Sequence, residues 1–221
     1  MNDSPTALPA PPRRRKPRGQ GHERRPEILA AAKAMFLADG FQAFTTRKLA
    51  ARVGLSQTGL YVYFKNKEEL LDAVCRQSFA VLLDAFHAAA SETPDGVSRL
   101  RALGLAYIQF GLTHPDEYRL TFLEGPGLQK MAPEAANDDG AQHQGIGNQV
   151  FQIIRGEFER LSDAGVLQDQ DLTIATHSVW FALHGLVSTF IARPSYLRAD
   201  PDALIDGLLD SLENGLRPAP L

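Results

Sequence analysis

The stretch TTRKLAARVGLSQTGLYVYFKNK, residues 45–67, predicts two short helices joined by a tight turn. Thr45 or Thr46 can cap the first helix, because a threonine hydroxyl accepts a hydrogen bond from the free backbone N–H groups of a first turn. The apolar residues that follow fall on one helical face. Gly54 comes next, where a left-handed backbone favours a residue without Cβ. Ser56 then provides a new cap for the second helix.

The second helix presents polar side chains outward. It carries Gln57, Thr58 and Tyr61 beside the apolar residues Leu60 and Phe64. Two helices of this size and order fit the major groove of B-DNA, with the N-terminal side chains of the second helix entering first. The pattern therefore predicts DNA binding, and an ordinary helical hairpin is the alternative that two helices and a glycine turn leave open.

The residues around this segment resemble the DNA-binding domain of TetR-family transcriptional regulators. The resemblance runs from about Pro26 to Cys75. Its strongest markers are Phe36–Gly40–Phe41, the run Thr-Thr-Arg-Lys-Leu-Ala, and Leu60-Tyr61-x-Tyr63-Phe64-x-Asn66-Lys67. The resemblance implies an N-terminal three-helix helix-turn-helix domain, linked by a long helix to a helical ligand-binding and dimerisation domain.

Composition agrees with an all-α fold. Among the 221 residues 44% are apolar, helical periodicity recurs throughout, and β-branched runs with a period of two are missing. We expect no apolar run long enough to cross a bilayer, and the basic N-terminus lacks the apolar core of a secretory signal. A single cysteine, Cys75, excludes an internal disulfide. These features predict a cytoplasmic protein with no membrane partner.

The net charge of −3 conceals an asymmetry between the two halves of the chain. Residues 1–76 contain 14 Lys and Arg against 7 Asp and Glu, a net charge of +7. Residues 77–221 contain 9 Lys and Arg against 19 Asp and Glu, a net charge of −10. The basic half coincides with the helix-turn-helix, so we expect only that half to meet a polyanion.

The chain divides into three parts. Residues 1–25, with RRRKPR at 13–18, predict a disordered basic arm that either contacts DNA phosphates or only aids solubility. Residues 26–72 form the expected helix-turn-helix domain, and residues 73–217 the expected effector-binding and dimerisation domain. Outside the helix-turn-helix, helices are expected at about Pro26–Asp39, Lys67–Ser91, Val97–Thr113, Pro115–Leu123, Asn148–Ala164, Asp171–Ala192 and Pro201–Gly215.

Residues 124–147, EGPGLQKMAPEAANDDGAQHQGIG, predict a long loop. Loops of this length in a compact domain are usually functional or disordered. The segment is either a lid over a ligand cavity or a floppy connection.

The expected DNA contacts follow from the second helix and from the resemblance. Gln57 and Thr58 are best placed to read base edges, because glutamine can pair bidentately with adenine. Gly59 permits a close approach of the backbone. The resemblance implies that phosphates are held by Thr46, Tyr61, Tyr63 and Lys67, and that Arg47 reaches a base or a phosphate.

Trp180, His184 and Gly185 resemble the Trp-His-Gly signature of one subclass of TetR-type regulatory domains. In that subclass the implied role of the domain is homodimerisation and small-molecule sensing. The resemblance also implies that the last two helices, at about 171–192 and 201–215, form the dimer bundle.

The aromatic residues of the second domain are spaced as helix faces and predict a hydrophobic core. The resemblance implies that this core is hollowed into a pocket for a hydrophobic or amphipathic small molecule. A ligand there is expected to tilt the helix at 67–91, the one continuous element between the two domains. The candidate lining residues are Tyr107, Phe110, His114, Phe122, Phe151, Trp180, Phe181 and His184.

Enzymatic motifs are missing from the sequence. There is no G-x-S-x-G, no phosphate-binding glycine loop between a strand and a helix, and no H-E-x-x-H. His177 and His184 lie two turns apart, about 10 Å along a helix, which is too far for one metal ion. We therefore expect no catalytic site, no metal site and no cofactor.

The sequence thus predicts a homodimeric regulator, a repressor that a small molecule releases from a palindromic operator in double-stranded DNA. A constitutive DNA-binding protein whose C-terminal domain only dimerises is the alternative from another class. Activation in place of repression depends on the operator position, which the protein sequence does not specify.

Removal of residues 1–20 tests the role of the arm. The deletion takes away Arg13, Arg14, Arg15, Lys16 and Arg18 against one acid, Asp3. If the arm contacts DNA, the slope of log affinity against log salt should fall by about one unit for each phosphate that the truncated protein no longer neutralises. A salt titration of operator binding measures this slope, and an unchanged slope would leave the arm as a solubilising tail.

Overall fold

The computed structural model describes residues 21–93, 96–123, 146–167 and 170–216. Every regular element in these ranges is helical, which confirms the all-α prediction. In chain order the elements are α1 Gly21–Ala43, α2 Thr46–Arg52, α3 Gln57–Tyr61, α4 Lys67–Glu92, α5 Val97–Thr113, α6 Pro115–Tyr118, the π-helix η1 Arg119–Leu123, α8 Ile146–Asp163, α9 Leu172–Ala192, the 3-10 helix η2 Pro194–Tyr196 and α10 Pro201–Leu216.

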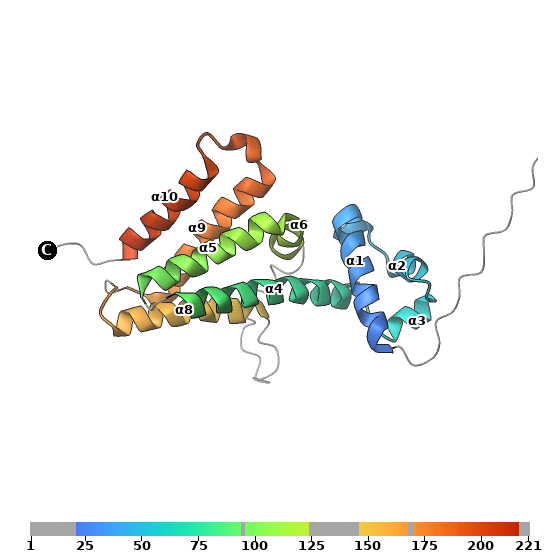
Figure 1. Ribbon diagram of the computed structural model, residues 1–221. Coiled ribbons are helices and arrows are strands. Elements are labelled where there is room, and N and C mark those ends of the chain that lie inside the picture. Colours follow the sequence, from blue (N-terminus) through green and yellow to red (C-terminus); the bar gives the residue numbers. More distant parts are fainter. Residues whose placement is uncertain (1–20, 94–95, 124–145, 168–169, 217–221) are drawn as a thin grey trace, which may run out of the picture.

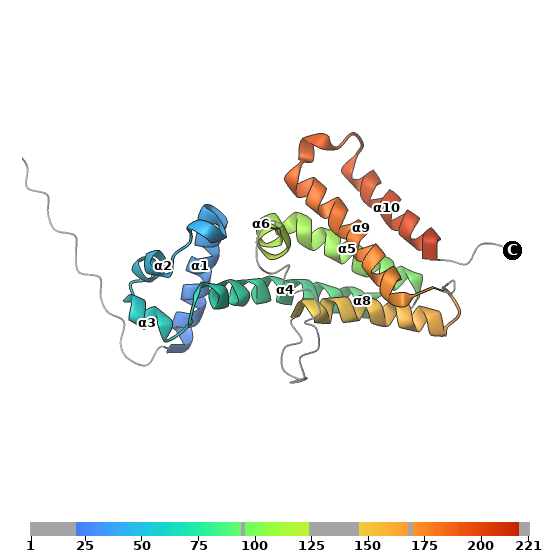
Figure 2. The same cartoon turned by 180° about the vertical axis from the view of Figure 1, so that it is seen from behind.

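The helices gather into two units along α4 (Figures 1 and 2). The first unit, α1 to α3, packs at the N-terminal end of α4, and the second unit lies along the rest of that helix. With 26 residues, α4 is about 39 Å long at 1.5 Å per residue. Its residue Leu70 is buried in the core of the first unit, and Leu82 and Phe86 are buried in the core of the second. One helix therefore belongs to both cores.

The core of the first unit is built on the predicted apolar stripe of α1. Ile28 and Ala32 have no exposed surface, and Phe36 is 1% exposed. The Phe36 ring stacks on the ring of Phe44 with 4.1 Å between centroids. Leu49 of α2 also has no exposed surface, so α1 supplies the surface on which the following short helices pack.

The predicted start of α1 is wrong. The helix begins at Gly21 rather than at Pro26, so residues 21–25 of the expected arm are helical. The sequence favours a start at Pro26 because proline is common in the first turn of a helix. The turn before Pro26 is stabilised by a residue outside the helix, because Arg25 Nη1 donates a hydrogen bond to the carbonyl of Tyr63 at 2.9 Å. At the other end, Gly40 takes a φ of 73° and breaks the helical geometry where a glycine stop is predicted.

Asn66 caps α4. Its side-chain oxygen accepts a hydrogen bond from the backbone N–H of Glu69 at 2.7 Å. The Glu69 carboxylate reaches back by one residue more than in the usual capping box and accepts from the N–H of Lys65 at 2.6 Å. These bonds satisfy backbone groups that would otherwise lack partners where α4 begins.

The core of the second unit forms where α5 is covered by α4, α8 and α9. Phe86 of α4, Ile108 of α5, Phe158 of α8 and Val187 of α9 all have no exposed surface. The expected bounds of α5 are confirmed, and those of α4, α8, α9 and α10 agree within two residues at each end. The expected helix at Pro115–Leu123 is divided into α6 and η1.

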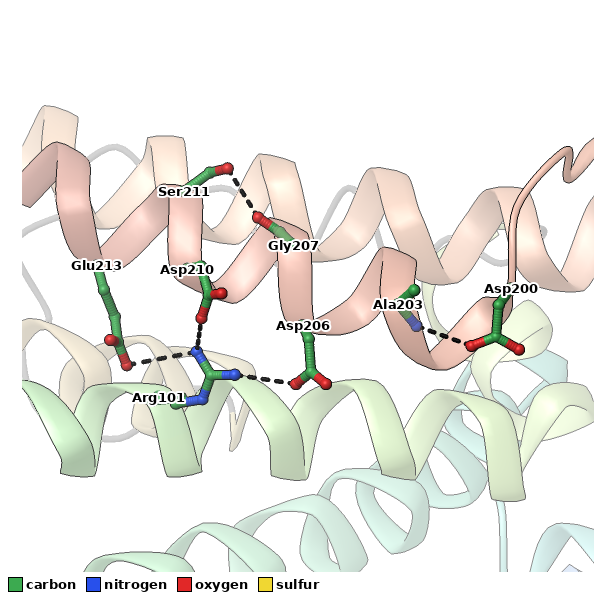
Figure 3. Close-up of polar contacts among 8 residues, drawn as sticks. All are labelled: Arg101, Asp200, Ala203, Asp206, Gly207, Asp210, Ser211 and Glu213. Atoms are coloured by element: carbon green, nitrogen blue, oxygen red, sulfur yellow. Dashed lines mark hydrogen bonds and ion pairs between the residues drawn. The ribbon is translucent and has the colours of Figure 1, made fainter.

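The last helix, α10, is fastened to α5 by one arginine (Figure 3). Arg101 Nη2 lies 2.9 Å from an oxygen of Asp206, and Nη1 lies 2.7 Å from Asp210 and 3.7 Å from Glu213. Asp200 caps α10, since its carboxylate accepts from the N–H of Ala203 at 3.0 Å. The ion pairs of Arg101 favour one position of α10 along α5, and the opposite face of α10 is exposed.

Our expectation that no segment could cross a bilayer needs correction. By length and composition α9 is long and apolar enough, with 21 residues and a mean hydropathy of 1.3. The helix α9 is this apolar because it carries small and aromatic side chains even on the face turned away from the core. One of them is Phe181, which is 60% exposed. A core helix of a globular protein has the same composition, and Val187 on the inner face is completely buried.

Most of the predicted loop at 124–147 lies outside the described residues, so the structure does not test its role. Only residues 146 and 147 are described, and they belong to the first turn of α8. Residues 1–20 of the predicted arm likewise lie outside the described ranges.

Gly111 allows α5 to approach both α9 and α6 closely. A Cβ at this position would lie 2.3 Å from Val187 Cγ1 and 3.1 Å from Tyr118 Cδ2. Gly111→Ala should therefore lower the free energy of unfolding by about 1–3 kcal/mol through overpacking. Chemical denaturation measures this decrease.

The matched control is Gly156→Ala in α8. A Cβ there would meet only the far end of the Arg160 side chain, at 3.6 Å. Because alanine is the better helix former, this variant should be as stable as the parent protein or up to about 1 kcal/mol more stable. Equal effects of the two substitutions would contradict the packing argument.

Candidate DNA-binding surface

The predicted helix-turn-helix is present at α2 and α3. Thr45 caps α2 by accepting from the N–H of Lys48 at 3.2 Å, and Ser56 caps α3 by accepting from the N–H of Gly59 at 3.0 Å. Gly54 lies between them with a φ of 69°, the left-handed conformation that favours glycine. All three sequence predictions about this turn are confirmed.

The outer face of α3 is polar and exposed, and its inner face is apolar and buried. Gln57, Thr58 and Tyr61 are exposed, whereas Leu60 has no exposed surface and Phe64 is 1% exposed. The unit that contains α3 is at one end of the molecule, with α3 turned away from the second unit (Figures 1 and 2). This face is free to enter a groove of a duplex.

Three predicted DNA-binding side chains form one hydrogen-bonded group. Gln57 Nε2 donates to Tyr61 Oη at 3.1 Å, and Thr46 Oγ1 lies 3.5 Å from the same oxygen. The hydrogen bonds from Thr46 and from Gln57 hold the pKa of Tyr61 below its ordinary value. The hydrogen bond to Tyr61 thereby orients the Gln57 amide on the exposed face of α3.

Basic side chains flank this group along the chain. Arg47, Lys48 and Arg52 of α2 and Lys65 after α3 are all exposed. Positive charge before and after α3 in the chain suits contacts with the DNA backbone, which receives about half to two-thirds of the hydrogen bonds between proteins and DNA.

Lys67, a predicted phosphate contact, has partners inside the protein. Its ammonium donates to the carbonyl of Phe41 at 2.8 Å and lies 3.9 Å from the centroid of the Phe41 ring. A cation over an aromatic ring gains electrostatic attraction, more so when it is partly buried. Lys67 therefore joins α4 to the end of α1.

Gly59 and Tyr63 also have roles inside the protein. A Cβ at Gly59 would lie 3.2 Å from Ser56 Oγ, so the glycine leaves room for the cap of its own helix. Tyr63 lies beyond the end of α3 and is half-buried, and its carbonyl accepts the hydrogen bond from Arg25.

The sequence prediction missed Arg24 and Arg25, which it assigned to the disordered arm. The Arg25 guanidinium lies 4.3 Å over the ring of Phe64, and Arg24 Nη1 donates to the carbonyl of Val53 at 3.4 Å. These contacts tie α1 to the ends of α2 and α3. The one signal in the sequence is a basic pair a turn ahead of Ile28, which composition alone attributes to the arm.

The predicted ligand-binding residues meet only in part. Tyr107, Phe122, Trp180 and His184 come together around Tyr118, which is not among the predicted lining residues. Tyr118 Oη lies 2.6 Å from His184 Nδ1 and 3.0 Å from Tyr107 Oη. The His184 ring stacks between Tyr118 and Trp180, with centroids at 5.6 and 5.2 Å. We call Tyr107, Tyr118, Phe122, Trp180 and His184 the aromatic cluster.

Of the remaining candidates, Phe181 touches the edge of the aromatic cluster, with 5.2 Å between its ring centroid and that of Trp180, and the others have different ring partners. Phe110 packs beside His114, with 5.5 Å between ring centroids. Phe151 of α8 contacts His177 with centroids 4.8 Å apart. Phe181 is 60% exposed and therefore does not belong to the core, contrary to the prediction from its helical spacing.

Burial determines the protonation of the aromatic cluster. It raises the pKa of Tyr118 to about 12 and raises the pKa of Tyr107 well above its ordinary value. Burial lowers the pKa of His184, so its imidazole is neutral at pH 7. A neutral imidazole has one donor and one acceptor nitrogen, so the tautomer decides which atom donates in the hydrogen bond between Nδ1 and the Tyr118 hydroxyl.

The two clearest hollows among the described residues lie beside α10. The larger, of about 270 Å³, is between the first turns of α9 and the end of α10 and is lined by Gln170, Ile174, Ser178, Ser211 and Gly215, among others. The smaller, of about 20 Å³, lies where Leu183 and Leu209 meet Gly104. Neither is lined by a predicted ligand-binding residue. Within the described ranges no three His, Cys, Asp or Glu residues are grouped to hold a metal ion.

Known proteins resemble this chain in both sequence and fold. The family described as bacterial regulatory proteins, tetR family, matches residues 28–74, and the tetracyclin repressor-like C-terminal domain matches residues 100–212. The nucleoid occlusion factor SlmA of Edwardsiella ictaluri is 29% identical over 174 residues, which cover 76% of this chain and 83% of SlmA.

Two solved structures illustrate the likeness of fold. A protein of unknown function from Rhodococcus sp. RHA1 superposes with a TM-score of 0.72 at 24% identity, over 92% of this chain and all of that one. The fatty acid degradation regulator FadR of Bacillus halodurans gives a TM-score of 0.68 at 19% identity, over 92% and 100% of the two chains. Together with the helix-turn-helix geometry, the two family matches show that this chain belongs to the TetR family of DNA-binding transcriptional regulators.

Proposed function

We propose that this protein is a cytoplasmic homodimeric repressor that binds a pseudo-palindromic operator and leaves it when a small hydrophobic or amphipathic molecule binds. The observation that carries the proposal is the preorganised group of Thr46, Gln57 and Tyr61 on the exposed face of α3. Each subunit inserts this face into one major groove, and Gln57 and Thr58 contact base edges.

Members of the TetR family act as dimers, and α9 and α10 are the proposed interface in this chain. Ile174 and Phe181 of α9 are 66% and 60% exposed. On α10 a row of small residues at intervals of four lies on an exposed face, namely Ala203, Gly207, Ser211 and Gly215. Small residues let helices approach closely, and large exposed apolar side chains favour burial by a partner.

We place the effector at the aromatic cluster. Apolar rings with a few converging polar groups are typical of small-molecule sites. Two tyrosine hydroxyls and one imidazole meet within hydrogen-bond distance there, between α5, α6 and α9. Trp180 stacks on His184, and Gly185 follows, which supports assignment to the Trp-His-Gly subclass.

One observation favours the alternative of a constitutive DNA-binding protein. The polar groups of the aromatic cluster satisfy one another, and neither of the hollows beside α10 is lined by them. A well-packed core of this kind suits a domain that only dimerises. Selecting operator fragments from random DNA and then screening compounds for their release distinguishes the two functions.

Gln57→Ala should weaken binding at one symmetric base pair by about 1–3 kcal/mol per half-site, because alanine cannot form the bidentate hydrogen bonds to a base. Affinities for operators that differ at single positions measure this effect. Gln77→Ala, an exposed glutamine of α4 outside α3, is the control and should leave all affinities unchanged. If Gln57→Ala has the same base preference as the parent protein, Gln57 does not contact a base edge.

An inducing ligand should lower operator affinity by about 5–150-fold, a coupling of roughly 1–3 kcal/mol. The operator must weaken ligand binding by the same factor, because the linkage between the two sites is reciprocal. Titrations of each partner in the presence and absence of the other measure both factors. A compound that binds tightly but leaves operator affinity unchanged is not the signal.

A further inference from the structure

Val62 is the most exposed large apolar side chain in the part of the chain that the structure describes. It is 81% exposed, compared with 67% for Tyr196 and 66% for Ile174. Val62 directly follows α3, next to the polar side chains that enter the major groove in the proposed function. A valine side chain has no hydrogen-bonding atom and no charge, so hydrogen bonds to bases or phosphates do not account for its exposure.

The helical path of α3 continues through Val62. Its backbone angles are helical, with a φ of −65° and a ψ of −28°. The N–H of Phe64 still donates to the carbonyl of Leu60, four residues earlier, at 3.1 Å. The directions of the side chains from Gln57 to Phe64 can therefore be compared on one helix, on which successive residues are about 100° apart.

Val62 points away from the core of the first unit. It is two residues from Leu60 and two residues from Phe64, so it lies about 200° around the helix from each of them. Leu60 has no exposed surface and Phe64 is 1% exposed. The side chain of Val62 is therefore at the middle of the exposed side of the helix.

Thr58 extends the apolar surface of Val62 by one methyl group. Thr58 is exposed and precedes Val62 by four residues, the spacing at which two side chains are neighbours on a helix. Gln57 and Tyr61 have the same spacing and are joined by a hydrogen bond of 3.1 Å. The exposed face thus carries a polar row, Gln57 and Tyr61, beside a second row, Thr58 and Val62, which we call the methyl row.

The major groove of DNA offers one apolar group at the edges of its base pairs, the C5-methyl group of thymine. The other groups that distinguish the bases there are hydrogen-bond donors and acceptors. Contact between a valine and a thymine methyl group removes both from water, which is favourable for apolar surfaces. The chemistry of the methyl row therefore matches thymine among the four bases.

We propose that Val62, together with the methyl group of Thr58, selects thymine in the operator by van der Waals contact with the C5-methyl group. Val62 is five residues beyond Gln57, which is about 7.5 Å along the helix, or about two base-pair steps of 3.4 Å. Each half-site accordingly carries a thymine about two base pairs from the position that Gln57 contacts. The polar row and the methyl row then read neighbouring bases by different chemistry.

This inference rests on the proposed function, because it names a base that the DNA-binding surface selects. The two can fail separately. If random DNA yields no preferred operator, the proposed function is wrong. If an operator is found but its thymine methyl groups have no effect on affinity, only the role of Val62 is wrong.

Deoxyuridine isolates the contact, because it lacks the methyl group of thymidine and keeps its hydrogen-bonding groups. In a selected operator, each thymine is replaced by deoxyuridine at one symmetric pair of positions at a time, and the Kd of the full-length protein is measured. One pair of positions should weaken binding by about fourfold per half-site, the effect expected for one methyl group that leaves an apolar contact. Val62→Ala should respond at that pair by less than about twofold, since alanine lacks the two methyl groups of valine.

A change of base tests whether the methyl group alone is recognised. Cytosine and then 5-methylcytosine replace the sensitive thymine, with guanine in the opposite strand. The methylated base restores a C5-methyl group to the same place in the groove. The parent protein should bind the 5-methylcytosine operator about fourfold more tightly per half-site than the cytosine operator, and Val62→Ala should bind the two equally.

Val81→Ala is the matched control, because Val81 is an exposed valine of α4 in the second unit, next to the buried Leu82. Its response to deoxyuridine should equal that of the parent protein. Thermal unfolding of Val62→Ala should match the parent protein, since the truncated side chain is not part of a core. The proposal is overturned if no deoxyuridine position weakens binding by the parent protein, or if Val62→Ala keeps the full response.

Discussion

A helix of five residues such as α3 has no stability of its own in water, and the exposed polar face of this helix depends on that constraint. The helix α3 exists because Leu60 and Phe64 are buried in the core built on α1 and because Ser56 and Gly54 define its start. Burial of the apolar side leaves Gln57, Thr58 and Tyr61 on the opposite side. The position of α1 therefore determines the direction in which the polar side chains point.

The contacts of α1 extend this dependence across the molecule. Each of these cations has its partner on another segment of the chain. Arg25 ties α1 to the end of α3, Lys67 ties α4 to the end of α1, and Lys33 ties α1 to α6. A shift of α1 relative to α4 or α6 would consequently move the exposed face of α3.

In the second unit, the aromatic cluster holds the helices in place relative to one another. Buried hydroxyl and imidazole groups need hydrogen-bond partners, and here Tyr107, Tyr118 and His184 provide them for one another. Because the three residues come from α5, α6 and α9, the hydrogen bonds fix these helices relative to one another. A ligand with its own polar group would compete for the same bonds, which is a physical route from binding to movement.

Much of the local structure was predictable from short-range chemistry. The caps at Ser56 and Asn66 and the glycine at Gly54 follow from side chains within four residues of the backbone groups that they satisfy. The start of α1 was not predictable in this way, since its first turn is held by a carbonyl 38 residues further along the chain. The internal partner of Lys67 was not predictable for the same reason, because Phe41 lies in another helix.

The sequence by itself determined the helical fold, the helix-turn-helix, the polar residues on the exposed face of α3 and the family to which the chain belongs. Only the tertiary structure decided which charged and aromatic side chains meet, such as Lys33 with Glu117 and Tyr118 with His184. Helical periodicity and capping are set by neighbours along the chain, and so they can be read from it. Contacts between helices depend on how the helices pack, and no spacing in the sequence records that.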